Sequence, residues 1–209
     1  MLISDLDDTL YDWTGFFVPA FYAMADEIAR MTGIDEKKLL NEYMAAHQRL
    51  GSVEYPYATL ELPSIKAYYN NAPAEEMKAA LRPAFNVFNS VRESHLHLLP
   101  GVEEMLRALT EMGVTLIAYT ESSKENGFYR LMKLGIEPYF KHVYTFESQF
   151  KSAYAVSEKV RTVQTKKPDV AVIERICTGE GYDKSEVMYL GDNLSLIHIS
   201  EPTRLLSIS

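Results

Sequence analysis

The 209-residue sequence contains one cysteine, Cys177, and so cannot form an internal disulfide. It has no run of lysines and arginines, and its 21 basic residues are outnumbered by 29 acidic ones, for a formal net charge of -8. It also lacks internal repeats, low-complexity segments and any apolar stretch long enough for a signal peptide or a transmembrane helix. These absences argue against nucleic acid and membranes as partners and predict a reducing, cytoplasmic location, while the oligomeric state stays open.

The pattern of apolar residues changes along the chain. A hydrophobic content of 47% is enough for a substantial core. Residues 14–95 carry apolar residues at helical spacing and contain no strong strand candidate. After that segment, predicted helices alternate with short apolar runs such as residues 114–119 and 187–190. Such alternation is typical of a parallel sheet with crossover helices, so the sequence predicts an α/β fold with a helical insertion.

Several residues predict where helices begin or bend. Ser122 and Glu125 have the spacing of a capping box, which would start a helix directly after the strand at 114–119. Pro168 suits the first position of another helix. Pro83 lies inside a predicted helix and is expected to kink it, because proline has no backbone N–H to donate.

Three carboxylates crowd together after the first apolar run, at Asp5, Asp7 and Asp8. If the strand continues through Asp7, the side chains of Asp5 and Asp7 point the same way. If the chain instead turns at Asp7, its backbone carbonyl can face the site beside the Asp5 carboxylate. Either arrangement offers oxygen ligands to a hard cation such as Mg²⁺. The alternative is that Asp7 and Asp8 only form a turn.

Three further polar residues follow predicted strands or precede a predicted helix: Thr120, Lys167 and Asp192. In open parallel sheets, ligands bind at the carboxyl ends of the strands, so these residues could share a site with Asp5 and Asp7. Taken singly, Thr120 could be a helix cap, Lys167 a surface cation and Asp192 a turn residue.

Together these residues resemble the four motifs of the haloacid dehalogenase superfamily. Asp5-Leu6-Asp7-Asp8-Thr9, Thr120, Lys167 and Gly191-Asp192 occur in the order of those motifs. The resemblance implies a Rossmann-like parallel sheet core with an inserted helical cap. The core would comprise residues 1–13 and 96–193, and the cap residues 14–95.

The resemblance also implies roles for the site residues. Asp5 would attack the phosphorus atom and form an aspartyl phosphate, and Asp7 would protonate the leaving alcohol and then activate water. Mg²⁺ would be held by the Asp5 carboxylate, the Asp7 backbone carbonyl and Asp192. Thr120 and Lys167 would bind the phosphate. The expected activity is therefore Mg²⁺-dependent hydrolysis of a small-molecule phosphate ester.

Other activities stay open at this point. A phosphomutase would use the same aspartates, whereas a haloacid dehalogenase needs no acid at Asp7. A non-catalytic binding module with this fold is a third alternative. Glu121 would repel phosphate unless its side chain points away. Substrate specificity could lie in the predicted cap, whose segment between helices is rich in tyrosine: Tyr55, Tyr57, Tyr68 and Tyr69.

Residues 194–209 do not continue the pattern of the superfamily. Their sequence resembles an in-frame translation of a sequencing adapter used with a transposase, and we expect them to be a non-native tail. The second acid of the fourth motif would fall at Ile197. We therefore expect a core that is truncated at the C-terminus and a chain with weak activity or none.

Overall fold

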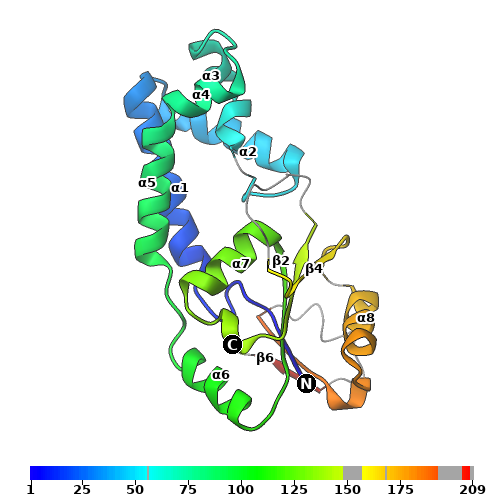
Figure 1. The fold of residues 1–209 in the computed structure, drawn as a ribbon. Helices are drawn as coiled ribbons and strands as arrows, with labels where there is room; N and C mark the ends of the chain where they lie inside the picture. The colour runs from blue at the N-terminus through cyan, green and yellow to red at the C-terminus, as the bar shows by residue number, and fades with distance from the viewer. Residues whose placement is uncertain (56, 148–156, 168, 193–203, 208–209) are drawn as a thin grey trace. The chain divides into compact units, whose positions relative to one another are not determined.

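The computed structural model describes residues 1–55, 57–147, 157–167, 169–192 and 204–207. The chain divides into two compact units (Figure 1). Met1–Trp13 and Leu96–Ser209 form the first, here called the α/β unit, and Thr14–His95 form the second, here called the helical unit.

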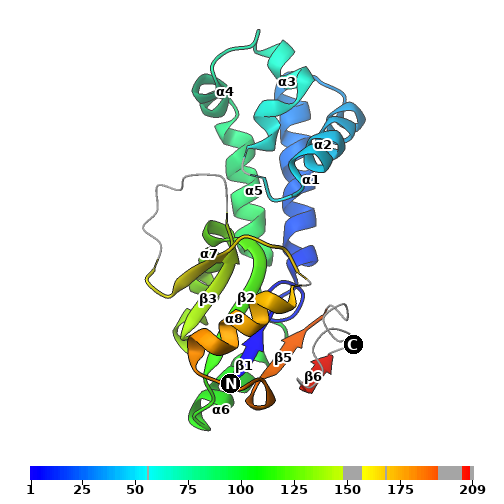
Figure 2. The same ribbon diagram turned by 90° about the vertical axis from the view of Figure 1, so that its right-hand side faces the viewer.

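The α/β unit is built on a six-stranded parallel sheet, which confirms the predicted fold class. The strand order is β4-β3-β2-β1-β5-β6, and every neighbouring pair is parallel. Figure 2 shows β1, β2 and β5 running in the same direction. The strands are β1 (Leu2–Ser4), β2 (Leu116–Ser123), β3 (His142–Phe146), β4 (Val160–Val163), β5 (Met188–Gly191) and β6 (Arg204–Ser207).

Helices cover both faces of this sheet. In Figure 1, α8 (Val170–Glu180) lies on one face, and α6 (Val102–Glu111) and α7 (Lys124–Lys133) lie on the other. Two short 3₁₀ helices, η2 (Glu137–Tyr139) and η3 (Lys184–Glu186), complete the described helices of this unit. Apolar residues of α8 pack on β1, β2 and β5, and Cys177 is buried in that core.

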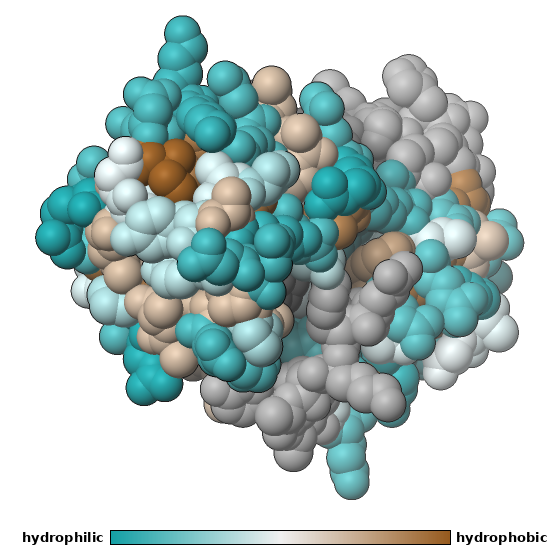
Figure 3. Space-filling view, turned by 90° about the horizontal axis from the view of Figure 1, so that it is seen from above, coloured by the Kyte–Doolittle hydropathy of each residue, from teal (hydrophilic) through white to brown (hydrophobic). Residues whose placement is uncertain are grey.

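The helical unit has its own apolar core. Its described elements are α1 (Trp13–Thr32), α2 (Glu36–Leu50), η1 (Ala58–Glu61), α3 (Pro63–Tyr68), α4 (Ala74–Ala80) and α5 (Arg82–His95). Ile28, Leu39 and Ile65 are fully buried in this core. None of the described helices is long and apolar enough to cross a membrane. The face of the molecule seen in Figure 3 is mainly hydrophilic, with small separate apolar areas.

Three helix predictions need correction. Ser123 caps α7, not Ser122, because β2 continues past Thr120 as far as Ser123. Asp169 caps α8, which begins at Val170, and Pro168 itself lies outside the described residues.

The third correction concerns Pro83. The chain forms two helices here, α4 and α5, instead of one kinked helix. Pro83 is the second residue of α5, where its missing N–H costs no helical hydrogen bond.

Two strands were not predicted. The sequence of β4, Val-Arg-Thr-Val, is too short and polar to stand out. The second, β6, lies within residues 194–209, which we expected to take no part in the fold. It pairs with β5 from Met188↔Arg204 to Gly191↔Ser207, because the edge of β5 offers free backbone hydrogen-bonding groups. Ile197 lies outside the described residues.

Candidate active site

The chain turns immediately after β1, so the arrangement with both aspartates on one strand was wrong. The Asp5 N–H donates to the Leu190 carbonyl at 2.8 Å. The Leu6 carbonyl then accepts from the N–H groups of Thr9 and Leu10, at 3.2 and 2.9 Å. Asp8 occupies this turn with a φ of 53°. Aspartate tolerates such backbone angles, and a local turn role therefore explains Asp8.

Asp5 is a buried carboxylate at the carboxyl end of the central strand. The exposed fraction of the whole Asp5 residue is 8%. One oxygen, Oδ1, accepts the Leu6 N–H at 2.7 Å and lies 2.7 Å from Nζ of Lys167. Burial raises the pKa of Asp5 to about 6, although Lys167 and the Leu6 N–H both act to lower it. Nearby Asp7 adds to the rise. The cost of this buried charge favours a cation beside Asp5.

Lys167 is held beside Asp5 by more than the ion pair. Its Nζ lies 4.7 Å from the ring centre of Tyr119 and 5.8 Å from that of Tyr189. The Lys167 N–H donates to Oε1 of Glu121 at 2.8 Å. The Glu121 carboxylate therefore stabilises the segment that carries Lys167, an arrangement that the sequence did not reveal.

The Asp7 carboxylate accepts four hydrogen bonds. Its Oδ1 accepts from the Tyr11 hydroxyl and from Nη1 of Arg130, both at 2.8 Å. Its Oδ2 accepts from the hydroxyls of Thr120 and Ser122, at 3.1 and 2.8 Å. The structure thus joins Asp7 of the first motif to Thr120 of the second.

Sequence reasoning missed three of these partners: Tyr11, Ser122 and Arg130. Ser122 could have been found, because a residue two positions after Thr120 on a strand lies on the same face. Arg130 stands on the buried face of α7, between buried Gly127 and Leu131. An arginine on such a face is unusual and is a signal for a paired, functional or structural charge.

Asp192 follows β5, and its backbone joins it to the first motif. The Asp192 N–H donates to Oγ1 of Thr9 at 3.1 Å, and its side chain is exposed. Among the described residues, no group of three or more His, Cys, Asp or Glu side chains could hold a metal ion. Mg²⁺ does not require such a group, since proteins bind it through one or two carboxylates together with water and substrate phosphate. The oxygen donors of Asp5, Asp7 and Asp192 fit this chemistry.

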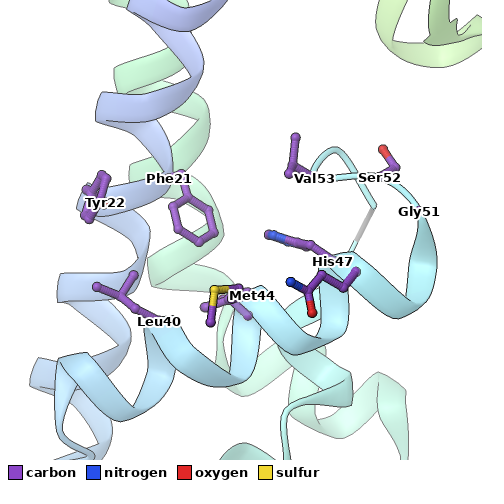
Figure 4. A pocket seen from close by; sticks show the side chains of 10 residues that line it. Phe21, Tyr22, Leu40, Met44, His47, Gly51, Ser52 and Val53 are labelled. Carbon is purple, nitrogen blue, oxygen red and sulfur yellow. The ribbon is translucent and has the colours of Figure 1, made fainter.

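A separate pocket of about 470 Å³ lies in the helical unit (Figure 4). The ring of His47 faces it, with its centre 5.7 Å from that of Phe21 and 5.6 Å from that of Tyr43. Burial lowers the pKa of His47 and so favours the neutral form of the ring. No Lys, Arg, Asp or Glu lines this pocket, which makes it a poor phosphate site. Of the cap tyrosines suggested by the sequence, none lines it.

An open parallel sheet with helices on both faces is a Rossmann-like α/β fold, and the carboxylates and lysine lie at the carboxyl ends of the strands, where such folds bind ligands. Residues 2–201 match the family described as haloacid dehalogenase-like hydrolase. The chain belongs to this family, and it is therefore a hydrolase of the haloacid dehalogenase superfamily.

Individual relatives are distant. A glyceraldehyde 3-phosphate phosphatase from Pyrococcus abyssi is 24% identical, over 93% of this chain and 73% of the relative. A 2-haloacid dehalogenase from Pseudomonas syringae is similar in structure, with a TM-score of 0.64, 20% identity and coverage of 99% of this chain and 84% of that one. A Bacillus subtilis structure described as a HAD-hydrolase bound to magnesium has a TM-score of 0.60 at 15% identity, with 99% and 87% covered. At these identities the two structures show the fold alone.

Proposed function

We propose that this hydrolase is a Mg²⁺-dependent phosphatase that cleaves a small-molecule phosphate ester through an aspartyl phosphate on Asp5. The observation that carries the proposal is the buried pair of Asp5 and Lys167. The exposed fractions of their side chains are only 11% and 6%, and their charged atoms are 2.7 Å apart. A carboxylate nucleophile needs a nearby cation in order to approach an anionic phosphate, and Lys167 supplies one.

The first step joins an Asp5 oxygen to the phosphorus atom while the bond from phosphorus to the ester oxygen breaks. The leaving oxygen takes a proton from Asp7. In the second step, water attacks the same phosphorus atom and gives a proton to Asp7. Inorganic phosphate leaves, and the Asp5 carboxylate is restored.

Phosphate binding is proposed for Lys167 and Thr120, which flank the two aspartates. The phosphoryl group carries spread negative charge, so its stabilisation depends mainly on positive charge and hydrogen-bond donors. Mg²⁺ bound to the carboxylates of Asp5 and Asp192 and the carbonyl of Asp7 would supply further positive charge. The fully buried Thr120 hydroxyl donates to Asp7, so its role includes holding that carboxylate.

Two of the relatives support the proposal. The relative from Pyrococcus abyssi is a phosphatase whose named substrate is a small phosphate ester. The Bacillus subtilis neighbour was determined with bound magnesium.

Two other activities of the superfamily, dehalogenation and phosphoryl transfer between hydroxyl groups, are the alternatives to hydrolysis. A dehalogenase has no use for an acid at Asp7, whereas here four hydrogen bonds position that carboxylate. A phosphomutase would transfer the phosphoryl group to a second hydroxyl instead of to water. Release of inorganic phosphate separates hydrolysis from transfer.

The test is an assay of this chain against a panel of small phosphate monoesters, with Mg²⁺ and with a chelator. We expect Mg²⁺-dependent phosphate release that Asp5→Asn abolishes. Asp8→Asn is the matched control, because asparagine tolerates the turn conformation of Asp8 and removes one neighbouring carboxylate. Turnover that survives Asp5→Asn would contradict the proposal, as would the absence of turnover in both the wild type and Ile197→Asp, which supplies the second acid of the fourth motif.

A further inference from the structure

The geometry points to Arg130 as a positioning residue that holds the Asp7 carboxylate in its working orientation. This inference rests on the proposed function, since it gives Asp7 its proton-transfer role.

Arg130 is buried and lies within hydrogen-bonding distance of Asp7. Its exposed fraction is 3%. The Nη1 atom donates to Oδ1 of Asp7 at 2.8 Å and to Oγ of Ser122 at 2.9 Å. Removing a guanidinium from water is costly unless it is paired and hydrogen-bonded. Its placement on the buried face of α7 is therefore accounted for by these contacts.

Asp7 needs partners of this kind because it lies in a turn and not on a strand. Its orientation comes from groups on β2, on α7 and on the segment after β1. Three of its four donors are neutral hydroxyls, whereas Arg130 is charged, and a charge-assisted hydrogen bond is roughly twice as strong. Ser122 donates to Asp7 and accepts from Arg130, so each of the three side chains is hydrogen-bonded to the other two.

A residue that acts through Asp7 has a clear signature. Removing such a residue should slow the steps in which Asp7 transfers a proton. The same removal should have no effect in a variant whose residue 7 can no longer transfer a proton. A residue that binds phosphate directly, or that only supports the fold, would keep its effect when Asp7 is altered. A double-mutant cycle separates these cases.

The experiment measures kcat and KM for wild type, Arg130→Met, Asp7→Asn and the double variant, with ethyl phosphate and p-nitrophenyl phosphate. We expect Arg130→Met to lower kcat for ethyl phosphate by roughly 10- to 100-fold, which is less than the roughly 10²- to 10⁴-fold that general acid–base catalysis contributes, because Arg130 acts through Asp7. KM should change little. The loss should be smaller for burst-phase release of p-nitrophenol, because that leaving group needs little protonation. In the Asp7→Asn background, Arg130→Met should add no further loss.

Equal losses in both backgrounds would overturn the inference while leaving the proposed function intact. No turnover by the wild type or by Ile197→Asp would overturn both. Arg130→Lys keeps the charge and is expected to restore part of kcat, whereas a purely steric role predicts no rescue. Lys133→Met removes a charge from the same helix and is the matched control, with unchanged kinetics expected. If Arg130→Met does not fold, Arg130→Gln runs the same cycle.

Discussion

Lys167 Nζ lies 2.7 Å from Oδ1 of Asp5, which places a cation from the segment before α8 against the carboxylate that directly follows β1. Both side chains are almost fully buried. In the proposed mechanism, this pair and the hydrogen-bonded Asp7 would provide a nucleophile, a counter-charge and a proton carrier at one edge of the sheet.

The buried charge of Asp5 should destabilise the protein at neutral pH in the absence of Mg²⁺. The usual pKa of an aspartate here is 3.8, and burial raises that of Asp5 to about 6. The folded state therefore binds the proton more tightly than the unfolded state. Stability from this group is fully present below pH 3.8 and is lost as the pH rises through about 6. A rise of this size corresponds to roughly 3 kcal/mol, as an upper limit.

Asp5→Asn stays neutral and should therefore increase the free energy of unfolding near neutral pH. The gain should shrink at about pH 4, where Asp5 is protonated in the folded state. The attraction of Lys167 is already included in the raised pKa, so its loss does not cancel the effect. Urea unfolding at the two pH values measures this difference. Equal or lower stability of the variant at neutral pH would show that Asp5 carries no such cost.

Tyr119 offers a matched pair of substitutions. Its hydroxyl is buried and has no hydrogen-bond partner among the described residues, while its ring lies against Lys167. Tyr119→Phe removes the unpaired hydroxyl and keeps the ring, so we expect about 1 kcal/mol of added stability and unchanged activity. Tyr119→Leu also removes the ring and should lower both stability and kcat. A loss of stability in Tyr119→Phe would mean that the hydroxyl has a partner.

Some of this site could be predicted from the sequence and some could not. The parallel sheet followed from continuous apolar runs, since buried parallel strands have that composition. The proximity of Asp5 and Lys167 followed from the order of the motifs and from the carboxyl ends of parallel strands meeting at one edge. The strand β4 escaped prediction because its four residues carry little apolar signal.

Side-chain partners were the hardest part to predict. The Arg130–Asp7 contact depends on how α7 is rotated over the sheet, which tertiary packing decides. From the sequence, Glu121 looked unfavourable for phosphate binding. Its contact with the Lys167 backbone could not be foreseen, because it joins segments that are far apart in the chain. The one-residue shift from Ser122 to Ser123 as the cap of α7 mattered as well, because it left Ser122 available to Asp7.

Glu180 should stabilise the α/β unit away from the candidate site. Its side chain is 2% exposed, forms an ion pair with Lys141 and accepts hydrogen bonds from His142 and Tyr144. Burial alone would raise the pKa of Glu180, but Lys141 and His142 hold it below the usual 4.5. The stability it provides is thus present above pH 4.5 and is lost as the pH falls through the lowered value.

We expect Glu180→Gln to lower the free energy of unfolding by about 1–3 kcal/mol at neutral pH, and by less in acid. Glu174→Gln is the control, because the ion pair of Glu174 is exposed and should contribute less than about 1 kcal/mol. Thermal unfolding of both variants as a function of pH makes the comparison. Equal effects of the two substitutions would contradict the assigned role of Glu180.

Asp192 should affect Mg²⁺ more than it affects folding. Its side chain is exposed, whereas its backbone N–H makes the contact with Thr9, and asparagine preserves that contact. Asp192→Asn should therefore raise the Mg²⁺ concentration needed for half-maximal activity by about tenfold or more. Asp183→Asn, at the cap of η3, is the control and should leave the Mg²⁺ concentration for half-maximal activity unchanged. An unaltered Mg²⁺ requirement in Asp192→Asn would exclude Asp192 as a ligand.

In the proposed mechanism, the phosphoryl group is transferred to Asp5. The most direct measurement is acid quenching during turnover, followed by mass spectrometry of the peptide that contains Asp5. We predict that this peptide gains the mass of one phosphoryl group in the wild type and gains nothing in Asp5→Asn. Turnover by the wild type with no phosphorylated peptide, or with the phosphoryl group on another residue, would contradict the proposed role of Asp5.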